Sequence, residues 1–93
     1  MDYKHSTIAE THSDRHPSTV NILKWLEPSP GVKAHGGPAA IIASGIENLT
    51  REILENIEQD SPELTAGLRK ILEAKDCLVR AALDESPGFW TDR

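Results

Sequence analysis

Apolar residues recur with a helical period along much of the chain. After Pro38 they follow steps of four, three, four and four residues, at Ile42, Ile46, Leu49, Ile53 and Ile57. Because each residue advances about 100° around a helix, these positions form one stripe of a long helix that begins at Pro38. Ile41 and Leu54 fall off that stripe, which predicts a second contact surface on the same helix.

A second long helix is predicted after a short polar segment. Ser61 is a good N-cap, Pro62 suits the first helical position, and Glu63 complements the positive helix end. The apolar side of this helix comprises Leu64, Leu68, Ile71, Leu72, Leu78, Val79, Ala82 and Leu83. The helix is expected to end near residues 84–86. So short a connection predicts an antiparallel hairpin, with arms on the order of 30 Å long.

The N-terminal part of the chain gives weaker signals. Residues 1–15 show neither a helical nor a strand period, and we expect them to form a mobile arm. Residues 16–93 are expected to form a single helical domain. Within it, Ser18 can cap a helix of about two turns whose apolar positions lie between residues 20 and 26. Prolines end that helix near Glu27, and residues 28–37 are interpreted as a linker.

Composition narrows the possible functions. Fifteen acidic against ten basic residues give a formal charge of -5, which disfavours binding to a DNA or RNA duplex. The longest apolar run, from Ala39 to Ala43, is far shorter than the roughly 20 residues that span a bilayer, so no membrane partner is expected. The single cysteine, Cys77, excludes an internal disulfide and indicates an intracellular protein.

The predicted hairpin leaves apolar surface uncovered. The helix before it is short and covers only part of that surface, while Ile41 and Leu54 need a further neighbour. We therefore expect an all-α fold, with a short N-terminal helix followed by a long antiparallel helical hairpin, assembled as a homo-oligomer.

Lys75 lies in the middle of the apolar stripe of the second long helix, at roughly 20° from Leu64. Burial of an unpaired ammonium costs several kcal/mol, so three arrangements are open. Lys75 extends to solvent, pairs with a carboxylate such as that of Glu52 or of another subunit, or faces a cavity that binds an anion. Only the third would make it a ligand-binding residue.

A second candidate for anion binding is the segment Lys33-Ala34-His35-Gly36-Gly37. Glycines let a ligand approach the backbone, amides at the start of the next helix are unpaired, and Lys33 and His35 add donors. The alternative is an ordinary turn and cap, because the segment matches neither the Walker nor the dinucleotide-binding pattern.

Other side chains add to these two candidates. Trp25 offers a face for stacking on a nucleobase, or it fills a packing site. Arg69 and Arg80 lie on the solvent side of the second helix, where they are merely solvated or complete a phosphate site across an oligomer interface. Phe89 and Trp90 follow the last helix and are expected to dock on a neighbouring surface.

Metal and catalytic chemistry are poorly supported. His12 and His16 have the spacing of a helical metal pair and His5 is near, but no cysteine or acidic pattern completes a site. Cys77 has no histidine placed to activate it, and no nucleophile turn is recognisable. We expect no enzyme activity, no metal and no cofactor.

The second helix carries a recognisable pattern. It has a capped start at Ser61, Leu68, the pair Glu73-Ala74 and the pair Ala81-Ala82, and a helix and a proline-containing segment precede it. In these features it resembles the C-terminal helix of the phage helical-hairpin sponge family, which counters the bacterial CBASS and Thoeris defences. Actinobacteriophage proteins of this kind also look similar around His16-Pro17-Ser18-Thr19. The resemblance covers about half of the chain.

The resemblance implies a homo-oligomer without catalysis, in the cytoplasm of an infected bacterium. Such a protein sequesters cyclic di- or trinucleotides or cyclic ADP-ribose isomers, and so deprives a defence effector of its activator. Two alternatives remain open. One is a small helical module that binds a host or phage protein through the same apolar stripe, and the other is a hydrolase of these signals.

Overall fold

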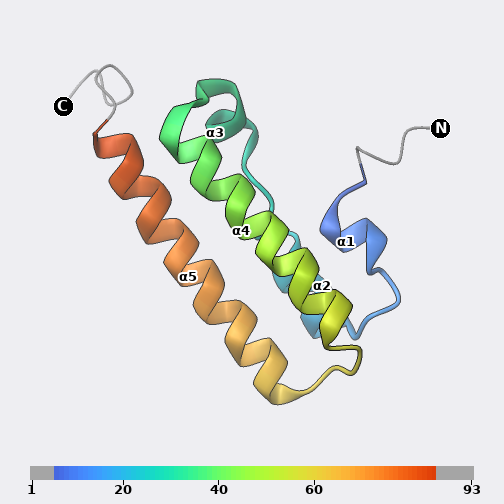
Figure 1. Cartoon of the computed structure of the whole chain (residues 1–93). Coiled ribbons are helices and arrows are strands. Elements are labelled where there is room, and N and C mark those ends of the chain that lie inside the picture. Colours follow the sequence, from blue (N-terminus) through green and yellow to red (C-terminus); the bar gives the residue numbers. More distant parts are fainter. Residues whose placement is uncertain (1–5, 86–93) are drawn as a thin grey trace.

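The computed structural model describes residues 6–85, and these residues are helical with no strand among them (Figure 1). Its helices are α1 (Ile8–Thr11), α2 (Pro17–Leu23), α3 (Pro30–His35), α4 (Gly37–Asn56) and α5 (Pro62–Asp84). The prediction of an all-α chain is thereby confirmed for this part of the sequence. No helix in the described range combines the length and the apolar character needed to cross a membrane.

The two long helices dominate the molecule. α4 and α5 pack side by side and run in opposite directions, joined by a short loop (Figure 1). As the sequence predicts, the Ser61 hydroxyl caps α5 by accepting a hydrogen bond from the Leu64 amide at 3.1 Å, and Pro62 is its first residue. The shorter helices add to this pair: α2 packs against α5, α3 against α4, and α1 against α2.

The core is divided into two apolar clusters along the long helices. The first, near the loop between α4 and α5, comprises Ile8, Ile22, Leu23, Leu26, Leu54, Leu64 and Leu68. The second, at the other end of the same helices, comprises Val32, Ala39, Ala43, Val79, Ala82 and Leu83. At the second cluster, the small Ala39 and Ala43 of α4 let this helix pack closely against α3 and α5. The larger side chains of the first cluster fill the wider space between α1, α2 and the long helices.

The face that α4 buries differs from the predicted stripe. Its buried residues are Ala39, Ala43, Thr50 and Leu54, with Leu54 only 2% exposed. The predicted stripe instead lies at the edge of this face, because Ile42, Ile46 and Ile53 are half-buried and Leu49 and Ile57 are exposed. The second contact surface predicted at Leu54 exists and faces the first cluster. Ile41 is 71% exposed, so it has no such neighbour within the described residues.

Residues 6–15 are more structured than predicted. The chain forms α1, whose N-cap Thr7 and Glu10 make a capping box: the Thr7 hydroxyl accepts from the Glu10 amide, and the Glu10 carboxylate accepts from the Thr7 amide. Ile8 is fully buried in the first cluster. The expectation that these residues lack a helix was wrong, because a single turn is too short to show a period, although Thr-x-x-Glu is a capping signature.

Two further predictions about helix boundaries were wrong. α2 begins at Pro17 and ends at Leu23, and its N-cap is His16, whose Nδ1 accepts a hydrogen bond from the Ser18 amide at 3.1 Å. The expected linker contains α3, because the Ser29 hydroxyl accepts from the Val32 amide at 3.2 Å and Pro30 takes the first helical position. A proline that ends one helix can therefore begin the next.

Candidate functional site

Two adjoining grooves lie between α2 and α5, and both are lined by Ser18 and Arg69. We refer to them together as the α2–α5 groove. One part, of about 450 Å³, is lined also by Asn21, Ile22, Trp25, Leu72 and Glu73. The other part, of about 480 Å³, is lined also by His16, Asp60, Ser61, Pro62, Thr65 and Ala66. Both volumes lie in the range that small-molecule sites occupy.

Trp25 and Arg69 supply the most distinctive chemistry of this groove. The Trp25 side chain is 67% exposed, so it is not the packing plug that the sequence also allowed. The exposed Arg69 lies across the groove on α5. An exposed indole and a guanidinium on one open surface can stack on a flat ring and pair with an anion. Glu73 lines the same part and can accept hydrogen bonds from hydroxyl or amino groups.

Lys75 supports this groove from within the chain. Its Nζ donates hydrogen bonds to the carbonyl oxygens of Trp25 and Glu27, both at 2.6 Å. None of the arrangements considered from the sequence describes this one, because the ammonium meets backbone carbonyls. Burial lowers the pKa of Lys75, while the negative charges of Asp76 and Glu27 act in the opposite direction. Two of its three N–H donors are therefore engaged, and Lys75 attaches the turn after α2 to α5.

The turn that carries Trp25 is also held from the other side. The Glu27 carboxylate accepts a hydrogen bond from the Ile8 amide at the start of α1, and it lies 3.9 Å from the Arg51 guanidinium of α4. Together with Lys75, these contacts connect the turn to α1, α4 and α5. The Trp25 backbone is therefore placed by several elements, while its indole stays open to solvent.

Asp60 organises the opposite end of the groove. Its carboxylate accepts hydrogen bonds from the His16 amide at 2.8 Å, the Thr19 hydroxyl at 3.0 Å and the Arg15 guanidinium at 3.3 Å. The His16 amide contributes most to holding the pKa of Asp60 below its ordinary value. Burial is the second-largest effect and raises this pKa, whereas Thr19 and Arg15 add to the lowering. This carboxylate fixes the start of α2 on the loop between the long helices.

The glycine-rich junction lies at a different place. Lys33, His35, Gly36 and Gly37 lie where α3 meets α4, at the end of α4 remote from the Asp60 loop (Figure 1). Gly36 and Gly37 have φ of 73° and 69°, a conformation that explains the glycines without a ligand. The junction packs near residues 79–83 of α5, about 15–21 Å along that helix from Arg69.

The remaining candidates are dispersed. Arg80 is exposed near the C-terminal end of α5, and it lines neither part of the α2–α5 groove. Cys77 is an exposed free thiol, as predicted. Among residues 6–85 no cluster of three His, Cys, Asp or Glu side chains could hold a metal ion, and His16 serves as a helix cap. The predicted docking residues Phe89 and Trp90 lie outside the described residues.

Sequence reasoning named Trp25 and Arg69 but missed the other residues that line the groove. Ser18, Asn21 and Trp25 share one face of α2 and its following turn, at spacings of three and four residues. Thr65, Arg69 and Glu73 share a face of α5 at spacings of four. Such periodic polar faces could have been found in the sequence, but nothing in the sequence pairs the two faces across space.

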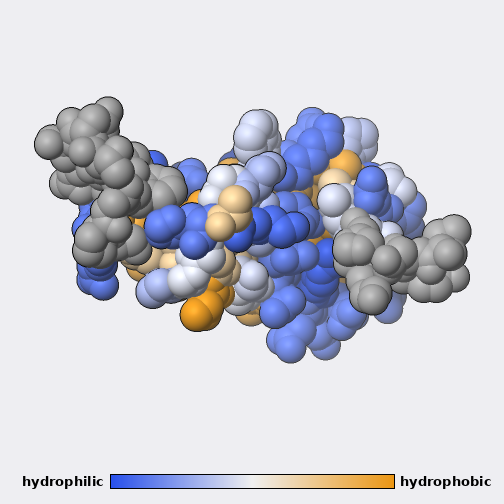
Figure 2. Space-filling view, turned by 90° about the horizontal axis from the view of Figure 1, so that it is seen from above, coloured by the Kyte–Doolittle hydropathy of each residue, from blue (hydrophilic) through white to orange (hydrophobic). Residues whose placement is uncertain are grey.

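The surface outside the groove is mostly polar, with scattered large apolar side chains. Figure 2 shows one face of the molecule, on which hydrophilic residues dominate and hydrophobic ones emerge in small areas. Among residues 6–85, the exposed large hydrophobic residues outside this groove are Ile41, Leu49, Ile57 and Leu78. Comparisons with protein-family models, curated proteins and solved structures find no match to this chain.

Proposed function

We propose that this protein is a sponge that binds a cyclic nucleotide immune signal in the cytoplasm of an infected bacterium and sequesters it without cleavage. The observation that carries the proposal is the shared groove of Trp25 and Arg69. An indole gives a nucleobase a stacking surface worth about 1–3 kcal/mol, and a guanidinium pairs with phosphate oxygens in a bidentate way.

The length of the groove favours a ligand larger than one base. Its two parts meet at Ser18 and Arg69, so a phosphate at Arg69 would have ligand atoms on both sides of it. On one side lies the indole of Trp25. On the other side lie the Thr65 and Ser61 hydroxyls and the His16 imidazole, which suit the hydroxyl groups of a ribose.

The same proposal includes a helical-hairpin homo-oligomer. One stack and one guanidinium give only weak binding once ordering costs are subtracted, so a second source of cations is needed. Lys33 and the other junction residues lie too far along the same chain to supply it, whereas a neighbouring copy can. Exposed Ile41, Leu49 and Leu78 on the long helices favour such association.

A second candidate function rests on those same apolar side chains. A small helical module that binds a host or phage protein would use an exposed apolar face of α4 and α5. It predicts binding to a protein partner and no response to nucleotides.

Calorimetric titration against a panel of cyclic dinucleotides, cyclic trinucleotides and cyclic ADP-ribose isomers tests the proposal. We expect saturable binding of at least one member and recovery of that ligand intact, by mass, after heat denaturation of the protein. Trp25→Ala and Arg69→Gln should each weaken binding at least tenfold. Lys24→Ala and Lys70→Gln are matched controls, because each replaces an exposed neighbour of the tested residue.

The outcomes separate the rival functions. Silence across the panel would overturn the sponge and leave the protein-binding module. A chemically altered ligand would identify a hydrolase. Binding that Trp25→Ala and Arg69→Gln leave unchanged would overturn the assignment of the α2–α5 groove as its site.

A further inference from the structure

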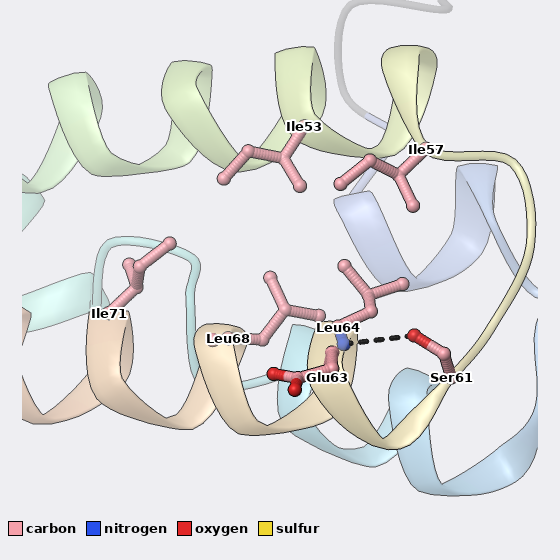
Figure 3. Close-up of a pocket in the computed structure, with 8 residues that line it drawn as sticks. Ile53, Ile57, Ser61, Glu63, Leu64, Leu68 and Ile71 are labelled. Atoms are coloured by element: carbon pink, nitrogen blue, oxygen red, sulfur yellow. Dashed lines mark hydrogen bonds between the residues drawn. The ribbon is translucent and has the colours of Figure 1, made fainter.

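A separate apolar groove lies between the two long helices, close to the loop that joins them (Figure 3). Ile53 of α4, its C-cap residue Ile57, and Leu64, Leu68 and Ile71 of α5 point into the space between the helices. Gly67 also lines the groove and contributes no side chain to its wall. Ser61 and Glu63 lie at one end of it. The groove measures about 310 Å³, and most of its wall is hydrocarbon.

This groove has the size for one or two large side chains. It lies at the lower end of the range for small-molecule sites, which is too small to take a whole helix along its length. Gly67 adds to its openness, since a Cβ at this position would meet no atom within 4 Å. A groove of this kind is best filled by aromatic rings, which bury about 150–250 Å² each.

The chain itself carries such side chains directly after α5. Two of its four aromatic residues, Phe89 and Trp90, are adjacent there. They lie beyond Glu85, the last residue that the structure describes. Within one chain, however, the two rings cannot together reach the part of the groove formed by Leu64 and Leu68. A fully extended chain advances about 3.5 Å per residue, so the Trp90 backbone lies at most about 18 Å from Glu85. Leu68 lies about 26 Å from Glu85 along α5, at about 1.5 Å per residue.

We propose that Phe89 and Trp90 of a second copy of this chain occupy the groove between α4 and α5. The tail of one copy meets the loop end of another, so the contact forms only between chains. This contact is independent of the nucleotide site, because the groove shares only Ser61 with the lining of the α2–α5 groove.

Disulfide trapping between two single-cysteine chains tests the proposal in the full-length protein. In a Cys77→Ser background, a Glu63→Cys chain is mixed with a Thr91→Cys chain under mild oxidation. Mass spectrometry then measures the mixed disulfide, which can form only between copies. Both introduced thiols lie beside the contact and leave its apolar residues intact. Lys70→Cys, an exposed position of α5 that does not line the groove, replaces Glu63→Cys as the matched control.

Two further variants show which side chains drive the trapping. Phe89→Ala/Trp90→Ala in the Thr91→Cys chain removes the rings. Gly67→Met in the Glu63→Cys chain fills the groove without a backbone clash and replaces glycine by a better helix former. Gly45→Met is its control, because this helical glycine is equally open and does not line the groove.

We expect the Glu63→Cys and Thr91→Cys chains to form the mixed disulfide at least tenfold faster than the Lys70→Cys control. Phe89→Ala/Trp90→Ala and Gly67→Met should each abolish that advantage, whereas Gly45→Met should keep it. Equal trapping at both α5 positions, or trapping that survives loss of the rings, would overturn the proposal. So would a disulfide within one chain that predominates when Glu63→Cys and Thr91→Cys are combined in it.

Discussion

The ammonium of Lys75 lies 2.6 Å from the carbonyl oxygen of Trp25, and it donates a hydrogen bond to it. A second bond of the same length goes to the Glu27 carbonyl. Lys75 belongs to α5, the helix that also carries Arg69. The two hydrogen bonds therefore fix the backbone of Trp25 relative to the helix that carries Arg69. Under the proposed function, Lys75 is therefore a positioning residue, and Arg69 is the residue proposed to contact the anion.

Lys75→Met should destabilise the protein by about 2 kcal/mol, measured by urea denaturation. The methionine keeps most of the apolar stem but leaves two carbonyls without their charged donor, and such bonds contribute about 1.5–3 kcal/mol each before solvent exposure reduces them. Lys70→Met on the exposed side of α5 is the control and should change stability by less than about 0.5 kcal/mol. A gain in stability for Lys75→Met would mean that apolar packing outweighs the two bonds.

Asp60 should make stability depend on pH in the acid range. Its folded pKa lies below the ordinary value, chiefly because the His16 amide favours the carboxylate. The folded state therefore binds a proton less readily than the unfolded state. The stabilisation is fully present above the unfolded pKa, about 3.9, and is lost as the pH falls through the lower folded pKa.

Asp60→Asn tests this linkage. The variant should be less stable than the parent protein at neutral pH, and the difference should shrink as the pH falls below about 4. Urea denaturation at a series of pH values measures it, with Glu58→Gln, an exposed carboxyl in the same loop, as the control. A difference that stays constant down to pH 2 would show that the negative charge of Asp60 is not what stabilises the loop.

Local signals in the sequence were sufficient for the long helices. Ser61 and Pro62 start α5 where predicted, because both act within one turn of the backbone. The same reasoning applied to Ser29 and Pro30 would have found α3, but the nearby proline was interpreted only as a helix breaker. Thr7 and Glu10 likewise carried the signal for α1.

The contacts of the candidate site could not be predicted in this way. Lys75 was located on the apolar stripe, yet its partners are carbonyls about 50 residues away in sequence, which no side-chain pattern records. The α4 stripe was misplaced for a related reason. The periodic pattern was traced through large apolar side chains only. In the structure, α3 and α5 each pack against α4 at Ala39 and Ala43, and Leu49 stays exposed.

Arg15→Lys should weaken the end of α4. The Arg15 guanidinium donates hydrogen bonds to the Leu54 and Ile57 carbonyls at 2.7 and 2.6 Å, and it also pairs with Asp60 at 3.3 Å. A lysine keeps the charge but cannot span acceptors in this fork geometry. We expect a loss of about 1–2 kcal/mol in urea denaturation. Faster amide exchange at Ile57, whose amide bonds to the Ile53 carbonyl, should accompany it. Unchanged exchange there would contradict a capping role.

Thr19 and Thr50 are both fully buried, yet replacement by valine should affect them differently. The Thr19 hydroxyl donates to the Asp60 carboxylate at 3.0 Å, so Thr19→Val removes one donor from a charged acceptor. The Thr50 hydroxyl donates to the Ile46 carbonyl of its own helix at 2.8 Å. When this bond is lost, that carbonyl still accepts its helical backbone hydrogen bond. We expect Thr19→Val to cost about 1–2 kcal/mol and Thr50→Val less than about 0.5 kcal/mol in urea denaturation. Equal losses would show that the Asp60 cluster adds nothing beyond packing, since valine has nearly the same shape as threonine at both sites.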